Sequence, residues 1–189
     1  MTPSDRTTDV VAALEAVTDE TRAAFGCLSD DQLNWKPSAA GWSIAQCLDH
    51  LMTINCLYFP LFESLSTGTV RPTFWERHSP FSGLFGRLLI RTVSPEYQKK
   101  VKTSAKAQPS ASRIDRAVER FAQHQTELTE RLRAIPKSVD PAGTVITSPL
   151  LRIVTYSLDD CLTIVAVHEK RHVEQAKRVT GAEGFPRAR

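Results

Sequence analysis

The sequence lacks the features of a secreted or membrane-spanning chain. Its start, Met1 to Arg6, has no basic segment followed by an apolar run, which a secretory signal peptide contains. No apolar run approaches the ~18 residues that a membrane-spanning helix needs. The four cysteines (Cys27, Cys47, Cys56 and Cys161) form no CxxC pair and lie in apolar helical patterns, so we expect reduced core residues. These absences predict a cytoplasmic protein without a membrane partner.

The sequence also has little excess of charge of either sign. The formal net charge is +3 at pH 7, and basic residues are interspersed with acidic ones, as in Glu169-Lys170-Arg171. We therefore expect no nucleic-acid partner. A glycine-rich phosphate loop, a GxSxG nucleophile motif and internal repeats are absent as well. We therefore expect the partner to be a small-molecule substrate.

Amphipathic helical patterns account for most of the chain. Apolar residues recur at three- and four-residue steps over residues 5–28, 44–65, 111–135 and 158–180. No segment shows a convincing strand pattern. Four long amphipathic helices in 189 residues predict an all-α fold, a four-helix bundle formed by a single domain over residues 1–189.

Start and stop signals define two of these helices. Ser43 and Gln46 match a capping box at the start of the second helix. Pro60 is expected to kink that helix or to end its regular part. Ser157 is the expected N-cap of the last helix, and Gly181 is expected to end it.

Two connections separate the first three helices. Residues 34–42 contain proline and glycine and form a loop, whose Trp35 and Trp42 are expected to cover one end of the core. Residues 66–110 are interrupted by prolines and form a long crossover between the second and third helices, with a possible short helix over 81–90. Four aromatic residues are expected to pack this crossover onto the core: Phe74, Trp75, Phe81 and Phe85.

The last helix carries the most distinctive pattern. His168 and His172 lie four residues apart, which places their Cβ atoms about 5–6 Å apart on one helix face. The same face continues to Val165 on one side and Gln175 on the other, so the two imidazoles extend an apolar stripe. His50 lies on the inner stripe of the second helix, two turns from its start.

His50, His168 and His172 are therefore candidate metal ligands. A single histidine on an apolar face is usually a core residue with a satisfied hydrogen bond, and this interpretation stays open. Three neutral imidazoles buried together need several partners, and protonated ones repel, whereas one divalent cation satisfies all three. Three nitrogen ligands leave an open coordination position, which is typical of a reactive site. By contrast, His78 is expected on an exposed loop and His124 at the boundary of the core.

Glu169 and Gln175 are candidate catalytic residues, as proton-transfer groups or as partners of the ligands. A solvated charge and a surface amide are the alternatives. Residues 168–172 also match the short HExxH pattern of zinc peptidases, in which the glutamate is the general base. Little sequence follows His172 to supply a third ligand, and no strand is evident to align a peptide. A metallopeptidase is therefore a distant alternative.

Two stretches carry a resemblance to a known family. They are LNWKP followed by GWSIAQCLDHL at residues 33–37 and 41–51, and the C-terminal pattern His168-x-x-x-His172-x-x-Gln175. Together, in this order and with the long crossover between them, they resemble the DinB/YfiT-like superfamily. The resemblance extends over essentially the whole chain.

The resemblance implies a bundle in up-down-down-up order, with His50, His168 and His172 holding a divalent metal, often nickel or zinc, at one end. Some relatives are transferases or isomerases that use a low-molecular-weight thiol such as glutathione, mycothiol or bacillithiol. Others are described as metal-dependent hydrolases, and members often form homodimers. No residue in this sequence singles out a thiol cosubstrate.

Two hypotheses of different classes follow. The first is a metal-dependent enzyme, a thiol-dependent S-transferase or a hydrolase, in which the metal stabilises a thiolate or hydroxide nucleophile. The second is a non-catalytic stress-response module that uses the metal site and the tryptophan loop to hold a ligand. The sequence does not identify the substrate.

Overall fold

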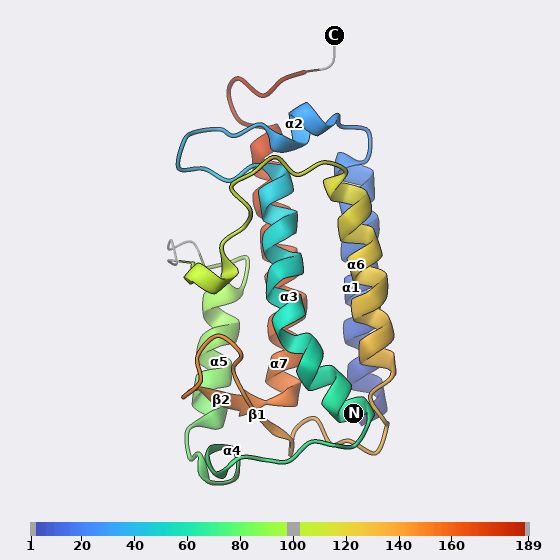
Figure 1. Cartoon of the computed structure of the whole chain (residues 1–189), viewed down its shortest axis with the longest axis vertical. Helices are drawn as coiled ribbons and strands as arrows, with labels where there is room; N and C mark the ends of the chain where they lie inside the picture. The colour runs from blue at the N-terminus through green and yellow to red at the C-terminus, as the bar shows by residue number, and fades with distance from the viewer. Residues whose placement is uncertain (1–2, 98–102, 188–189) are drawn as a thin grey trace.

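Four long helices form the body of the molecule. The computed structural model describes residues 3–97 and 103–187. Its long helices are α1 (Pro3–Phe25), α3 (Ile44–Ser66), α6 (Ala117–Arg133) and α7 (Leu158–Thr180). Each of α1 and α3 packs against both α6 and α7, which gives the helical bundle seen in Figure 1.

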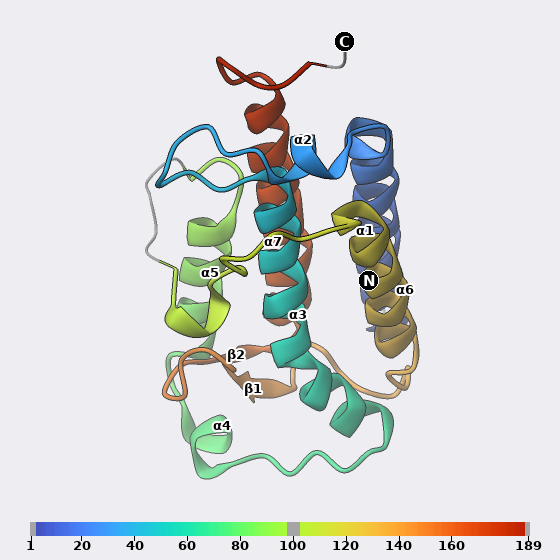
Figure 2. The same ribbon diagram turned by 45° about the horizontal axis from the view of Figure 1, so that its top comes forward.

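Shorter elements connect the long helices. They are α2 (Asp30–Asn34), α4 (Phe74–His78), α5 (Ser82–Val93), the 3-10 helix η1 (Ala105–Ala107), and the strands β1 (Val145–Thr147) and β2 (Thr155–Ser157). Helix α5 packs against α7 and β2, outside the four-helix core. Figures 1 and 2 both show α4 and the two strands at the end of the molecule opposite α2.

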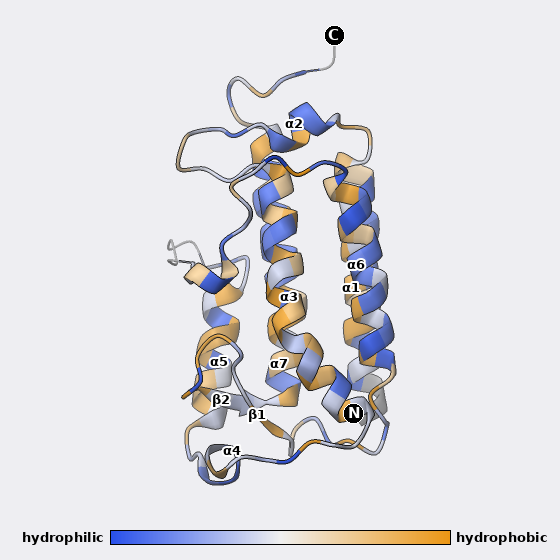
Figure 3. Cartoon of the chain, viewed as in Figure 1, coloured by the Kyte–Doolittle hydropathy of each residue, from blue (hydrophilic) through white to orange (hydrophobic). Residues whose placement is uncertain are grey.

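The core follows the apolar stripes of the four long helices. Leu14, Leu51, Phe121 and Leu162, one from each helix, have no measurable exposure. In Figure 3 the visible side of α6 is largely hydrophilic, while α3 is hydrophobic in its middle. Burial of these stripes, at about 25 cal/mol for each Å² of apolar surface, is the main force holding the bundle together.

The predicted helix signals are confirmed. The Ser43 side chain accepts from the Gln46 backbone N–H, and the Gln46 side chain accepts from the Ser43 N–H. The Ser157 side chain caps α7 at the Asp160 N–H, and Gly181 is the C-cap. Helix α3 continues through Pro60 to Ser66 and bends in its lower part in Figure 1. The bend agrees with the backbone hydrogen bond that a proline cannot donate.

Helix α6 begins six residues later than predicted, at Ala117 and not at 111. The preceding backbone bonds to α2 instead: Ile114 N–H donates to Asn34 Oδ1, and Arg116 N–H donates to Asp30 Oδ1. Arg116 has a φ of 52°, in the left-handed region, which breaks any continuous helix at that residue. Contacts with a distant segment thus override the helical pattern of residues 111–116.

The expectation that the chain has no strand is wrong. Strands β1 and β2 pair antiparallel with Ile146 opposite Tyr156, and both of these side chains are buried. Each strand has only three residues, so neither is long enough to display the alternation by which strands are predicted. The fold is mainly helical with one small hairpin.

Three of the four aromatic residues expected to pack the crossover onto the core are exposed. Phe74, Trp75 and Phe81 keep 70%, 64% and 56% of their surface accessible, and only Phe85 is half-buried. The crossover is attached through Leu89, Ile90 and Val93 of α5, which pack against the core. Tryptophans 35 and 42 do pack against the core, as predicted.

The cysteines are also only partly as predicted. Cys47 and Cys161 are buried, whereas Cys27 and Cys56 are exposed, and all four are free thiols. Burial raises the pKa of Cys47 to about 12, so this thiol is protonated and unreactive at neutral pH. In the part of the chain that the structure describes, no helix is both long enough and apolar enough to traverse a bilayer.

The Ser43 cap provides a test of the fold. We predict that Ser43→Ala lowers the free energy of unfolding by about 1 kcal/mol, because the Gln46 N–H loses its acceptor in a buried position. Ser38→Ala, in the same loop but exposed, is the matched control and should have little effect. Urea denaturation followed by circular dichroism measures both, and equal effects of the two substitutions would contradict the capping role.

Candidate metal centre

His50 is fixed by the returning crossover. It lies in α3, two turns from the Ser43 cap, and its side chain is 4% exposed. Its Nδ1 lies 2.6 Å from the carbonyl oxygen of Ala107 in η1. A carbonyl only accepts, so Nδ1 carries the proton and donates it, which leaves the lone pair on Nε2.

The crossover reaches this position because α3 binds its end. Asp49 Oδ2 accepts from the Ser110 backbone N–H, and Gln46 Nε2 donates to the Ser110 carbonyl. Both contacts come from the first two turns of α3. They place Ala107 beside His50, close enough for the hydrogen bond between them. Asp49 is half-buried, and its carboxylate holds the returning crossover through its bond to the Ser110 N–H.

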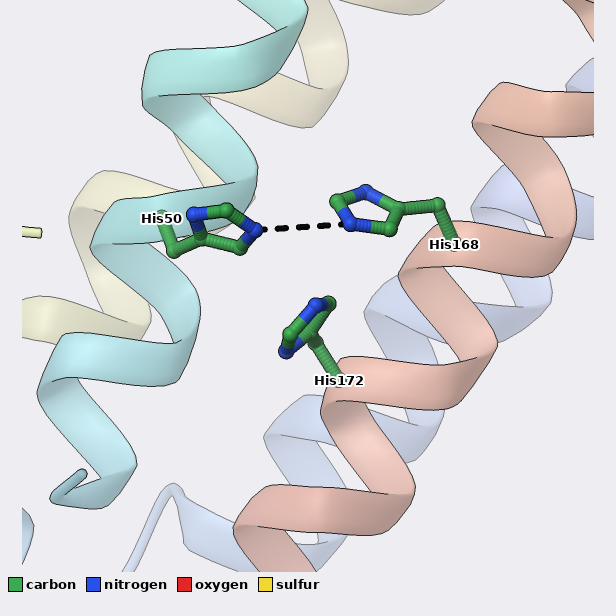
Figure 4. A group of neighbouring side chains, drawn as sticks. All are labelled: His50, His168 and His172. Atoms are coloured by element: carbon green, nitrogen blue, oxygen red, sulfur yellow. Dashed lines mark hydrogen bonds between the residues drawn. The ribbon is translucent and has the colours of Figure 1, made fainter. Parts of the chain in front are cut away.

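The histidine pair of α7 completes a cluster with His50. Figure 4 shows the three rings pointing toward one another, His50 from α3 and His168 and His172 from α7. His50 Nε2 lies 3.4 Å from His168 Nε2. One nitrogen of each ring can be chosen so that all three lie within 4.8 Å of one another. The structure thus brings together the three residues that the sequence analysis selected.

The cluster is held in its neutral form. Burial, together with repulsion from His50 and Arg171, lowers the pKa of His168 to about 3, although this ring keeps some exposure. Burial and the same neighbours lower the pKa of His172 well below its usual value, and burial lowers that of His50. Neutral imidazoles have free lone pairs, which is the form that binds a metal.

The donor set fits a divalent cation. His50 Nε2 presents its lone pair to the cluster, and His172 Nδ1 is buried without a hydrogen-bond partner. A buried polar nitrogen without a partner is costly, and a metal ion bound by the three rings would remove such a deficit. Three histidine ligands with an open position are the arrangement found in catalytic zinc sites.

Trp42 covers one side of the cluster. Its ring centroid lies 4.9 Å from that of His50, and it stacks on His172 at 5.8 Å. The Ser43 cap places Trp42 immediately before α3, so the same turn that starts the helix positions this ring. The tryptophan therefore packs against two of the three imidazoles and also forms part of the pocket wall.

The cluster lies at the wall of a pocket of about 760 Å³. This volume is within the range of small-molecule sites. Its wall combines the three histidines with residues from α3 and the loop before it, α5, the segment around η1, α7 and the loop before β2. They include Trp42, Ile54, Leu89, Thr92, Val93, Thr103, Ser104, Gln108, Leu150, Leu151, Arg171, Gln175 and Arg178. A smaller pocket of about 270 Å³ lies between α1 and the segment after α6 and contains no histidine.

Gln175 lines the pocket, one turn after His172. The Gln175 side chain is near the His172 ring and raises its pKa, which partly offsets the lowering by burial. It does not bond to His172 Nδ1, which has no hydrogen-bond partner. Gln175 is therefore placed where it can contact a molecule in the pocket.

Glu169 lies elsewhere. Its carboxylate is fully buried in the bundle, where Asn55 Nδ2 donates to it at 2.8 Å and Gln125 Nε2 at 2.6 Å. It does not line the pocket. These contacts favour a structural role, in which one carboxylate links α3, α6 and α7. They also disfavour the peptidase interpretation, in which the glutamate faces the metal.

The two remaining histidines of the sequence lie outside the cluster. His78 is exposed at the end of α4, as predicted, and His124 is half-buried on α6 with its ring stacked on Phe59 at 5.3 Å. Glu174 pairs with Lys177 on the surface of α7.

Sequence reasoning missed several residues that build the site. Ala107 contributes a backbone carbonyl, which no side-chain pattern can reveal. Arg171 Nη1 donates to the carbonyls of Ser94 and Tyr97, at 2.6 and 2.8 Å, and so ties the end of α5 to α7. Its position between the two histidine turns was the only available signal.

Comparison with known proteins agrees with this arrangement. A family model described as the DinB superfamily matches residues 13–176. The chain belongs to the DinB superfamily. No curated protein matches the chain. Within the matched range lie His50, His168 and His172 of this DinB-superfamily member, together with the capping box that starts α3.

A solved structure shares the fold. It is YfiT from Bacillus subtilis, described as a probable metal-dependent hydrolase with an unusual four-helix bundle topology. The alignment covers 95% of this chain and 89% of that chain, with a TM-score of 0.57 and 14% sequence identity. At this identity the likeness concerns the fold, and it supports the assignment of the four long helices to one bundle.

The buried carboxylate of Glu169 should make stability depend on pH. Burial raises its pKa to about 7, against about 4.3 for an exposed glutamate. The folded state therefore binds a proton that the unfolded state releases, and this contribution to stability is lost as the pH rises toward 7. We predict that Glu169→Gln becomes more stable relative to the wild type between about pH 5 and about pH 8.

Urea denaturation at several pH values measures this difference. Glu130→Gln, on the exposed side of α6, controls for the loss of one negative charge. A pH-independent difference between Glu169→Gln and the wild type would show that the carboxylate is ionised in its buried position.

Proposed function

We propose that this protein is a divalent-metal-dependent enzyme that acts on a small molecule, with His50, His168 and His172 as the metal ligands. The observation that carries the proposal is the convergence of three neutral imidazoles, two of them buried and one half-buried, at the wall of a large pocket. Nickel and zinc are the ions we propose, since imidazole nitrogen suits both. A bound ion would supply Lewis acidity, which lowers the pKa of a water or a thiol.

The residues around the cluster have defined tasks in this proposal. The Ala107 carbonyl holds the His50 ring with Nε2 toward the ion, and Trp42 packs against the same ring. Gln175 orients a polar group of the substrate from the pocket wall. Glu169 stabilises the α7 position from behind the ligands, through Asn55 and Gln125.

We favour hydrolysis over thiol transfer. The description of YfiT as a probable metal-dependent hydrolase supports it, on a shared fold. A hydrolase needs only water at the open position, whereas a transferase also needs a thiol cosubstrate, for which the sequence shows no dedicated motif. The thiol-dependent S-transferase stays as the second enzymatic form of the proposal.

One observation favours the non-catalytic alternative. None of the described residues that line the pocket is an aspartate or a glutamate, so no carboxylate there can act as a general base. A ligand-holding module needs no such base. Both the enzyme and the ligand-holding module would bind a metal ion, but only the enzyme would turn over a substrate.

The bundle order belongs to the same proposal. We propose the up-down-down-up order that the family resemblance implies. The course of the chain in Figures 1 and 2 supports it, since the connection after α3 passes α4 and α5 before it returns to the end of the bundle where α6 begins. This return is what brings η1 to His50.

Metal binding tests the site. We predict that zinc or nickel, at about 100 times its dissociation constant, raises the free energy of unfolding by about 2.7 kcal/mol, or roughly 5–10 °C in melting temperature. His50→Ala should lose this increase, because one of three ligands is removed. Thermal unfolding of chelator-treated protein with and without added metal measures both.

His78→Ala is the matched control, because His78 is exposed on α4, away from the cluster. It should keep the full increase. If the wild type binds no metal, or if His50→Ala and His78→Ala respond alike, the three-histidine site is refuted.

Turnover separates enzyme from binding module. We predict that the metal-loaded protein hydrolyses at least one ester or amide in a panel of small chromogenic substrates, and that His50→Ala loses at least about tenfold in kcat/KM. A parallel screen combines low-molecular-weight thiols with an electrophilic aryl halide. Activity only in that screen would favour the transferase, and inactivity in both would favour the binding module.

A further inference from the structure

The pocket above the histidines carries uncompensated positive charge. Arg171 and Arg178 both line it, seven residues apart on the same face of α7. Burial lowers the pKa of Arg171, and repulsion from Arg178 lowers it further, so the two positive charges lie close enough to act on each other. None of the described pocket-lining residues is acidic.

Among the described residues, neither arginine has an ion-pair partner. Arg171 Nη1 donates to the backbone carbonyls of Thr92, Ser94 and Tyr97, which are uncharged acceptors. Arg178 is exposed, and no carboxylate among the described residues lies within ion-pair distance of it. The nearby carboxylate of Glu174 is engaged with Lys177 instead.

Arg171 and Arg178 are set apart from the other arginines by their place at the pocket wall, since Arg120 and several more surface arginines also lack an ion pair among the described residues. Arg6, Arg113, Arg131 and Arg133 each form an ion pair with a described aspartate or glutamate. Arg171 and Arg178 instead line a space large enough for a small molecule, and no described residue of that lining is acidic. An unpaired guanidinium with free N–H groups at a pocket wall is an anion-binding group.

The remaining wall adds an apolar surface. Ile54, Leu89, Val93, Leu150 and Leu151 face the same space from α3, α5 and the loop before β2. Burial of an apolar group against them is favourable at about 25 cal/mol per Å². A ligand that satisfies both parts of the wall has an acidic group and an apolar body.

We propose that the pocket selects a small organic anion with an apolar body, and that Arg178 binds its acidic group. Arg171 contributes positive potential and holds α5, and therefore the apolar wall, in place. The inference rests on the proposed function in that it names the substrate class of the same site. Recognition of the anion by Arg178 does not require the metal, so it can be tested separately.

A pair of fluorescent probes tests the proposal on the whole, chelator-treated chain. One is 8-anilinonaphthalene-1-sulfonate, and the other is N-phenyl-1-naphthylamine, which has the same ring system without the sulfonate. We predict that the wild type binds the sulfonate more tightly, and that Arg178→Gln weakens its binding by about tenfold without changing that of the neutral probe. Arg178→Lys should fall between the two, because it keeps the charge and loses the forked geometry.

Arg120→Gln is the matched control, because Arg120 is exposed on α6, outside the pocket, and the change in net charge is the same. It should leave both affinities unchanged. Equal binding of the two probes, an unaffected Arg178→Gln, or an equal loss in Arg120→Gln would each overturn the proposal. Displacement of the dye by octanoate or by octyl phosphate, with octanamide as the neutral reference, distinguishes a carboxylate from a phosphate ligand. Failure to bind metal in the separate titration would refute the metal centre and leave this result unaffected.

Discussion

The hydrogen bond between His50 Nδ1 and the Ala107 carbonyl is the contact on which the site depends. It joins α3 to the far end of a crossover that leaves the bundle after residue 66 and returns near residue 110. The bond sets the tautomer of His50, and with it the direction of the Nε2 lone pair. The same approach of η1 to α3 forms one wall of the pocket. Without it, packing against Trp42 and His172 would still hold the His50 ring, but nothing would fix which of its nitrogens carries the proton.

Burial of three imidazoles has a cost that the rest of the bundle must offset. Burial lowers the pKa of His172, and the neighbouring histidines lower it further. In addition, His172 Nδ1 is buried without a hydrogen-bond partner. Such groups are destabilising in a core that binds nothing and useful in one that binds a cation. Glu169 shows the contrast on the neighbouring face of α7. It is equally buried, yet both of its oxygens have amide donors, so it forms a satisfied link between three helices. Adjacent residues in one helix thus serve two different purposes, set by the faces on which they lie.

Sequence periodicity was sufficient to predict features that lie within a single helix. The i, i+4 spacing put His168 and His172 on one face, and the Ser43 capping box defined the start of α3, so the depth of His50 in the bundle followed from the chain. It failed where distant segments decide the local backbone. Hydrogen bonds to α2 prevent residues 111–116 from joining α6, and a three-residue pairing partner creates β1 and β2. The exposed aromatic residues of α4 show a further limit, because large apolar side chains predict burial only if another element is available to cover them.

The sequence by itself determined the four amphipathic helices, the caps of α3 and α7, and the faces on which the three histidines lie, because each of these is encoded within a few consecutive turns. Only the tertiary structure decided which nitrogen of His50 faces the cluster, that Glu169 turns to Asn55 and Gln125, and that Arg171 and Arg178 share a pocket with the histidines. These features depend on where the crossover and α5 pack against α3 and α7. That packing is set by contacts between residues dozens of positions apart, which no local pattern contains.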